Sequence, residues 1–127
     1  MKRLFGLRGA VQSENTEADI IARVSALYDE LLLRNNMSEE DVASIIFSMT
    51  PDLDAQNPAA ALRRTGRAQE AALFTAQEAR IQGGLDRVIR VLLHCYLEED
   101  AVPYHVYQNG AEILRPDRAA KDKKKEE

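Results

Sequence analysis

The sequence DRVIRVLLH, residues 86–94, decides which fold the chain adopts. Five of the six residues 88–93 are apolar, which indicates a segment buried in a protein core. The apolar side chains also follow a helical spacing, at Leu85, Val88, Ile89, Leu92, Leu93 and Tyr96. The β-branched residues, the preceding glycine pair and a length near ten residues equally permit a buried strand. The pattern alone therefore leaves helix and strand open.

Arg90 lies in the middle of this apolar run. An arginine keeps its charge in a protein, and burial of an unpaired guanidinium costs several kcal/mol. The sequence therefore predicts an anion close to Arg90, although the local pattern does not identify it.

Length and composition restrict the class of protein. A chain of 127 residues fits one domain with one hydrophobic core. No run of eighteen apolar residues is present, and the N-terminal MKRLFGLRGA has neither a long apolar stretch nor a processing site, so we expect a cytoplasmic protein with no membrane partner. Cys95 is the only cysteine, which excludes an intrachain disulfide, and two histidines far from any carboxylate cluster disfavour a metal site.

The charge balance argues against a nucleic-acid partner. Seventeen basic residues and twenty-one acidic residues leave the chain mildly acidic, whereas a protein that tracks phosphates needs a broad basic surface. Four of the five lysines lie in the final KDKKKEE and the fifth is Lys2, so every cation between residues 3 and 120 is an arginine. The arginine side chain is a rigid fork that matches carboxylates in two-point contacts.

In the first third of the chain, the pattern predicts a strand followed by a helix. The apolar, glycine-containing RLFGLRGA indicates a strand over residues 3–9, with Arg8 near its end. Thr16, followed three residues later by Asp19, resembles a helix cap, and apolar residues at helical spacing continue to residues 35–36. SEEDV then repeats the cap signal for a brief turn.

The middle of the chain predicts a strand, a short helix and another strand. VASIIFSMT is β-branched and aromatic, and Pro51 ends it. NPAAALRRTG is a short helix with Pro58 at its start and Gly66 after its end. AALFTAQEA is a strand that delivers Gln77 and Glu78 at its end.

The last third predicts a β-hairpin and a charged tail. In YHVYQNGAEILRPD the dipeptide Asn109-Gly110 separates two strand-like pieces, which is a strong hairpin signal. We expect one domain over residues 1–117 and a mobile tail over residues 118–127. The order of elements favours an α+β domain, with helices on one face of a mixed sheet.

Five motifs, in order, resemble one known family. They are LRGA at 7–10, TPDL at 50–53, QE at 77–78, GGLxxxIRV at 83–91 and HVYxxxAxxLRPD at 105–117. Together they resemble the AroH-class chorismate mutases, which are small monofunctional enzymes. The resemblance runs over residues 7–117, which is nearly the whole chain.

The resemblance implies a fold, an assembly and a reaction. The fold would be ferredoxin-like α+β, assembled as a cyclic homotrimer that forms a pseudo-α/β barrel, with active sites between neighbouring subunits. The reaction would be the [3,3]-sigmatropic rearrangement of chorismate to prephenate, on the route to phenylalanine and tyrosine, with no metal and no cofactor. The segment around Arg90 would be a strand, on which Arg90 shares a face with Val88, Leu92 and His94.

The resemblance also implies the site residues. Arg90 would donate to the ether oxygen and to a carboxylate of chorismate, Arg8 and Tyr107 would donate to carboxylates, and Glu78 would hold the hydroxyl group. The remaining cleft residues would be Asn57, Ala59, Arg63, Phe74, Thr75, Ala76, Gln77, Leu114 and Arg115.

Some positions depart from the family or permit another interpretation. Asn57 and Ala60 stand where the family commonly has an aromatic residue and a lysine, and Thr75 stands where it often has cysteine. The lost cation at Ala60 predicts a higher KM. Arg63 equally fits the solvated end of a helix, where cations complement the dipole. An alternative function is a non-catalytic trimeric module of the same fold that binds a small carboxylate or a partner protein.

Overall fold

The computed structural model describes residues 1–114 of the chain. Its elements are β1 (Lys2–Gln12), α1 (Glu17–Arg34), the 3-10 helix η1 (Glu39–Asp41), β2 (Val42–Met49), α2 (Pro58–Arg64), β3 (Ala72–Gln77), β4 (Val88–Glu98), β5 (Val106–Gln108) and the 3-10 helix η2 (Ala111–Leu114). The expected tail and Arg115 lie outside the described residues. All the helices and strands expected up to residue 98 are present, with ends that differ by a few residues.

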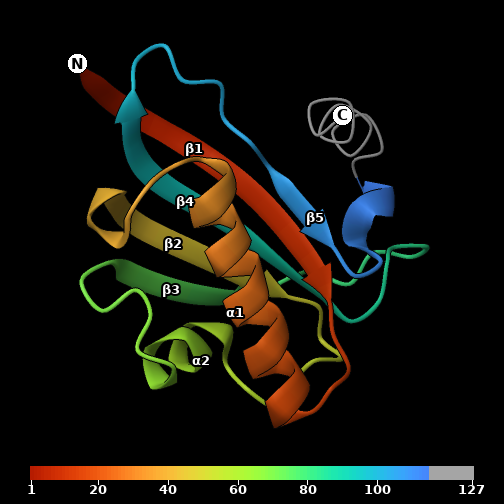
Figure 1. Cartoon of the computed structure of the whole chain (residues 1–127). Coiled ribbons are helices and arrows are strands. Elements are labelled where there is room, and N and C mark those ends of the chain that lie inside the picture. The colour runs from red at the N-terminus through yellow and green to blue at the C-terminus, as the bar shows by residue number, and fades with distance from the viewer. Residues whose placement is uncertain (115–127) are drawn as a thin grey trace.

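The strands form one mixed sheet in the order β3-β2-β4-β1-β5. β4 is antiparallel to both β1 and β2, whereas β5 is parallel to β1 and β3 is parallel to β2. Consequently four strands run in the same direction, namely β1, β2, β3 and β5. Their C-terminal ends lie at the same end of the sheet (Figure 1). β4 lies between β1 and β2, which makes β1-α1-β2 a split βαβ unit.

The segment around Arg90 is a strand, as the family resemblance implied. Alternate β4 residues are buried, from Ile89 through Val91 and Leu93 to Leu97, whereas Arg90 points to the other face and is exposed. The run is therefore apolar on both faces but buried mainly on one. This explains why its composition indicated a core segment and its periodicity remained ambiguous.

Both helices cover the same face of the sheet (Figure 1). Thr16 caps α1 as predicted, because its side chain accepts a hydrogen bond from the Asp19 backbone N–H at 3.1 Å. The apolar stripe of α1 packs against the inward side chains of the sheet. This core contains Leu7, Val11, Ile20, Val24, Leu27, Leu31, Ile45, Phe47, Leu62, Ile89 and Leu93.

Neither α1 nor α2 covers the opposite face of the sheet, and among residues 1–114 only the short 3-10 helix η2 packs at one end of it, where Ala111 contacts Ala10 and Val88. Large apolar side chains are exposed there, namely Leu4, Ile46, Phe74, Leu92 and Tyr96. We call this surface the open face. A contiguous apolar surface of this kind marks an interaction site in a soluble protein.

The predicted β-hairpin at Asn109-Gly110 is wrong. Both residues have positive φ, 49° and 100°, so a turn is present. However, β5 pairs in parallel with β1, and the chain after the turn forms η2 instead of a strand. The Asn109 side chain donates to the Gln12 carbonyl at 2.8 Å, which fastens the turn to the end of β1. The Asn109-Gly110 dipeptide determines only the conformation of the turn. The pairing of β5 depends on β1, whose edge is free to bind another strand.

Gly9 lies where the sheet and α1 approach each other closely. A Cβ at this position would lie 2.9 Å from Val91 Cγ1, 3.0 Å from the Val106 carbonyl and 3.2 Å from Leu27 Cδ1. We expect Gly9→Ala to lower the free energy of unfolding by about 1–3 kcal/mol, because overpacking displaces backbone atoms. Urea unfolding at fixed protomer concentration measures this change.

Gly6→Ala is the matched control for that substitution. Gly6 lies on the same strand, and its added Cβ would meet only Leu92 Cδ1, at an ordinary 3.7 Å. Its free energy of unfolding should stay within about 0.5 kcal/mol of the unchanged protein. Equal stabilities for the two variants would contradict the close packing of Gly9 under α1.

Candidate functional site

A row of neighbouring positions crosses the open face near the ends of the parallel strands. Strand pairing places Tyr107 beside Ala10, Ala10 beside Arg90, and Arg90 beside Ser48. Arg8 lies one row away, opposite Leu92. A cleft of about 280 Å³ is lined by Arg8, Gly9, Ala10, Ile46, Ser48, Arg90, Val91, Leu92 and Tyr107. Three of the four residues that the resemblance placed around substrate therefore line one cleft.

The fourth of these residues, Glu78, is the anion next to Arg90. Arg90 Nε lies 2.8 Å from Glu78 Oε1, and the Arg90 side chain is 45% exposed. The sequence-based interpretation of Arg90 as a buried charge is thus wrong for residues 1–114, because alternation along β4 directs it to the open face. Glu78 follows β3, and its backbone N–H donates to the Met49 carbonyl at 2.8 Å.

The geometry of this ion pair leaves polar atoms available to a ligand. Ser48 Oγ donates to the same Glu78 Oε1 at 2.7 Å, so both contacts use one carboxylate oxygen. The other oxygen, Oε2, and the two terminal nitrogens of Arg90 take no part in these two contacts. The pair therefore offers one acceptor and two donor groups in fixed positions.

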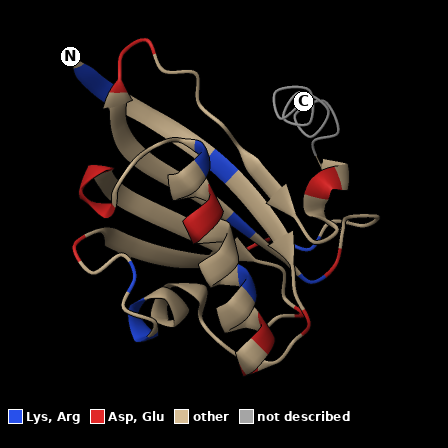
Figure 2. Ribbon diagram, viewed as in Figure 1, with Lys and Arg blue, Asp and Glu red and all other residues tan. Residues whose placement is uncertain are grey.

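Arg8 is held through its backbone and not through its guanidinium. The Arg8 N–H donates to His105 Nδ1 at 2.9 Å, immediately before β5 begins. Figure 2 shows that basic residues, drawn in blue, lie within strands of the sheet as well as in helices and loops. The side chain of Arg8 is exposed on the open face. This cation is therefore positioned at the cleft without a carboxylate partner among the described residues.

Tyr107 and Leu114 pack on a small second apolar cluster. The buried members of the cluster are Ala10, Val88 and Ala111, and Leu85 packs with them. Tyr107 is half-buried, which fixes its ring beside the row that contains Arg90. The structure thus places Leu114 in the same cluster as Tyr107, whereas Arg115 lies outside the described residues.

The remaining predicted residues form a second group around α2 and β3. The Asn57 side-chain oxygen accepts from the N–H groups of Ala59 and Ala60 and from Thr75 Oγ1, at 2.9, 3.1 and 3.2 Å. Asn57 is therefore the N-cap of α2. Thr75 pairs with buried Phe47 and so faces the helices. Arg63 is exposed in the last turn of α2.

This second group does not reach the cleft of the same chain. Asn57, Ala59, Arg63 and Thr75 lie at the helix-covered side of the sheet, whereas Arg90 points to the open face. β3 and β1 are also separated by β2 and β4, which is about 14 Å at the usual spacing of strands. Among the other residues, Phe74 and Ala76 are on the open face, and Gln77 leads into Glu78.

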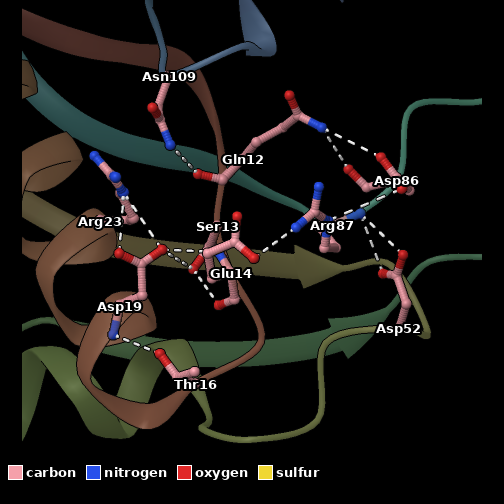
Figure 3. Close-up of polar contacts among 10 residues, drawn as sticks. All are labelled: Gln12, Ser13, Glu14, Thr16, Asp19, Arg23, Asp52, Asp86, Arg87 and Asn109. Carbon is pink, nitrogen blue, oxygen red and sulfur yellow. Dashed lines mark hydrogen bonds and ion pairs between the residues drawn. The ribbon is translucent and has the colours of Figure 1, made fainter.

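The TPDL motif holds the start of β4, two residues before Arg90. Thr50 exchanges two hydrogen bonds with Val88, from its backbone N–H at 3.1 Å and to its side-chain oxygen at 3.0 Å. The Asp52 carboxylate accepts the Arg87 backbone N–H at 3.0 and 3.2 Å (Figure 3). Arg87 has a strained φ of 49°, which these contacts hold in place.

The same junction connects β1 to the loop before β4 (Figure 3). Arg87 Nη1 donates to Glu14 Oε2 at 2.7 Å, and Gln12 Nε2 donates to the Asp86 carbonyl at 2.8 Å. The Asp19 carboxylate accepts the Glu14 backbone N–H at 2.7 Å, and this bond lowers the pKa of Asp19. The loops at the site end of the sheet are therefore cross-linked by charged and polar contacts.

Cys95 is the one cysteine of the chain, and it is buried in the core. Burial raises the pKa of the Cys95 thiol to about 11, so it is not a nucleophile at neutral pH. No group of three His, Cys, Asp or Glu side chains within residues 1–114 could hold a metal ion. No helix in this part of the chain is long and apolar enough to cross a membrane.

Sequence reasoning missed three contributors to the site. Ser48 contacts Glu78, His105 holds the backbone of Arg8, and Asp52 fixes the loop before β4. His105 and Asp52 belong to two of the five motifs, so the sequence marked both residues, but it did not indicate what either residue does. Ser48 could have been found from strand alternation, because it shares a face with Ile46, but only the pairing register shows that it lies beside Arg90.

Two arginines, a paired carboxylate and a tyrosine on one face of a mixed α+β sheet are the kinds of group that a binding site for a small anion requires. The family described as chorismate mutase type I matches residues 4–118, and the chain belongs to that family. It is an isomerase of the chorismate mutase type, which places it in aromatic amino acid biosynthesis.

Named relatives agree with this assignment. The chain is similar to the chorismate mutase AroH of Bacillus subtilis, with 35% identity over 88% of this chain and 90% of the relative. It is also similar to the chorismate mutase AroH of Thermus thermophilus, with 37% identity over 88% of this chain and 93% of the relative. A solved chorismate mutase from Clostridium thermocellum matches with a TM-score of 0.79 and 38% identity, over 87% of this chain and 99% of that one. The non-catalytic alternative is therefore not favoured.

Proposed function

We propose that the cleft of the open face binds chorismate and that Arg90, Arg8, Glu78 and Tyr107 carry its rearrangement to prephenate. Chorismate is a dianion with an ether bond that breaks during the reaction, and its ether oxygen gains negative charge as the bond lengthens. No proton is transferred and no bond to the protein forms. The protein must therefore hold a chair-like conformer and stabilise the developing charge.

Arg90 is the residue that acts on the ether oxygen in this proposal. Its Nε is paired with Glu78, which leaves the two terminal nitrogens for substrate. One nitrogen donates to the ether oxygen and the other donates to a carboxylate, in the two-point geometry that guanidinium favours. A donor already fixed in place stabilises the transition state without reorganisation, which is the strongest form of electrostatic catalysis.

The other three residues fix the substrate. Arg8 and Tyr107 donate to carboxylates. Arg8 lies two residues before Ala10 on β1, and Tyr107 pairs with Ala10 from β5. Glu78 Oε2 accepts the substrate hydroxyl, because Oε1 is occupied by Ser48 and Arg90. The observation that carries the proposal is this Arg90–Glu78 pair, because Arg90 lines the cleft that also contains Arg8 and Glu78 lies beside it.

A charge count supports completion of the site by another subunit. Arg8 and Arg90 in the cleft, with Glu78 paired to Arg90 beside it, give the site one net positive charge, whereas the substrate carries two negative charges. Arg63, with Asn57, Ala59 and Thr75, lies on the other side of the sheet of the same chain. A cyclic homotrimer joins different surfaces of adjacent subunits, and it can bring this second group to the cleft of a neighbour.

The open face provides a reason for assembly. Phe74 is 65% exposed and Tyr96 is 48% exposed in the single chain, and both lie on the face that carries the cleft. Burial of these side chains between subunits stabilises the assembly by about 25 cal/mol per Å² of apolar surface. We propose the homotrimer on this basis, and a mass measurement under native conditions tests it.

The experiment for the function follows chorismate directly. Purified protein is incubated with chorismate, loss of the conjugated-diene absorbance is recorded, and prephenate is identified by NMR. We expect loss far above the spontaneous rate without added metal or cofactor. A folded trimer that leaves chorismate at its spontaneous rate would contradict the proposal.

A further inference from the structure

Ser48 makes a contact that the proposed reaction does not assign. Its hydroxyl donates to Glu78 Oε1 at 2.7 Å, and the same oxygen lies 2.8 Å from Arg90 Nε. Ser48 is half-buried on β2, and the strand register places it directly beside Arg90 on β4 and beside Ala76 on β3. The serine therefore occupies the position between the arginine and the strand that delivers the glutamate.

We infer that Ser48 is a positioning residue that sets the orientation of Arg90 through Glu78; this inference rests on the proposed function. A carboxylate can rotate and can present either oxygen to either partner. The Ser48 hydroxyl holds one oxygen, and because Arg90 Nε lies 2.8 Å from that same oxygen, the ion pair restricts where the guanidinium can lie. The terminal nitrogens of Arg90 and the Oε2 of Glu78 then keep constant positions in the cleft.

Loss of the hydroxyl should reduce the reaction rate more than substrate binding. In Ser48→Ala the Glu78–Arg90 pair can remain, but its orientation is no longer unique. Charge on the ether oxygen develops only in the transition state, so misorientation of Arg90 lowers kcat more than it raises KM. We expect a loss of about tenfold or more in kcat, the size typical of groups that orient a catalytic residue.

Ser44 provides a matched control on the same strand. Ser44 lies on the same face of β2, four residues from Ser48, and its hydroxyl contacts His94 Nδ1 of β4 at 3.0 Å. Both serines thus make a side-chain contact with a polar residue, Ser44 with His94 of β4 and Ser48 with Glu78 after β3. Ser44→Ala should keep the kcat of the unchanged protein, and Ser48→Thr, which retains a hydroxyl, should recover most of the lost rate.

A double-mutant cycle distinguishes positioning from a general structural effect. If Ser48 acts through Glu78, then Ser48→Ala should change kcat little when Glu78 is already alanine. A full tenfold loss in that background, or an unchanged kcat in the single variant, would overturn the inference. Equal thermal unfolding of the variants at fixed protomer concentration excludes loss of folded protein.

A measurement independent of activity separates this inference from the proposed function. The Arg90 Nε–H signal in ¹⁵N NMR reports how rigidly the guanidinium is held. We expect faster solvent exchange at this group in Ser48→Ala and no change in Ser44→Ala. An unchanged signal in Ser48→Ala would refute the positioning role, even if the protein proved inactive on chorismate; inactivity of the unchanged protein would instead refute the proposed function alone.

Discussion

Arg90→Gln lowers kcat/KM for chorismate by more than about 10³-fold in our account. Removal of one preorganised donor typically costs about 10²–10³ in rate, and Arg90 serves two groups of the substrate. Glutamine is neutral and has only one amide nitrogen. It therefore cannot form an ion pair with Glu78 and also present two charged donors to the ligand. The loss should fall mainly on kcat, because the interaction with the ether oxygen strengthens as the bond breaks. Steady-state kinetics measured by diene absorbance provide the test.

Arg90→Lys separates the charge from the shape of the side chain. Lysine keeps the cation but offers one nitrogen, so it cannot contact Glu78 and present a two-point donor together. We expect its loss to approach that of Arg90→Gln. Because Arg90 is 45% exposed, neither variant should unfold the protein. A lysine variant with near-normal kcat/KM would contradict the orienting role of the Glu78 pair.

The second large effect is expected at Arg8. Arg8→Ala removes the guanidinium that has no ion pair among residues 1–114, and the charge of the cleft falls from one positive to zero. We expect kcat/KM to fall by about 10²–10³-fold, with a larger share in KM than for Arg90, because Arg8 contacts a carboxylate that is charged before and during the reaction.

Arg3→Ala is the matched control for Arg8. Arg3 is an exposed arginine on the same strand, and its guanidinium lies 3.8 Å from the centre of the Phe5 ring, away from the cleft. Removal of this cation changes the net charge equally but should leave kcat/KM unchanged. If both variants lost activity equally, the effect of Arg8 would be one of overall charge and not of position.

The sequence predicted the positions of the helices and strands better than it predicted which strands pair with each other. Caps and prolines placed α1, α2 and the end of β2 correctly, because these signals act over a few residues. The helix-or-strand choice for the segment that contains Arg90 needed the family resemblance, because apolar residues on both sides of a strand also satisfy helical spacing. The hairpin failed because the turn at Asn109 and Gly110 does not specify which edge β5 will meet.

The site was predictable as a set of residue types but not as a geometry. A permanent charge within the apolar run indicated that Arg90 needs an anion, and this expectation is met by Glu78. Glu78 could not be identified as that partner from pattern, because the two residues come from different strands that are brought together only through β2. For the same reason the position of Ser48 between them follows only from the pairing register, although strand alternation already places Ser48 on the face of Ile46.

The central claim is that each catalytic site joins the cleft of one subunit to the α2 and β3 group of its neighbour, and subunit mixing tests it most directly. The Arg90→Gln variant lacks the cleft arginine, and Arg63→Glu places a negative charge at the second group, so each homotrimer should be nearly inactive. Each mixed trimer has about one site in three that combines an intact cleft with an intact second group. Random mixing of equal amounts makes about three quarters of the trimers mixed, so activity should return to about a quarter of the unchanged protein. Mixed trimers that are verified by native mass and remain as inactive as their parents would contradict the shared site, as would full activity of Arg63→Glu alone.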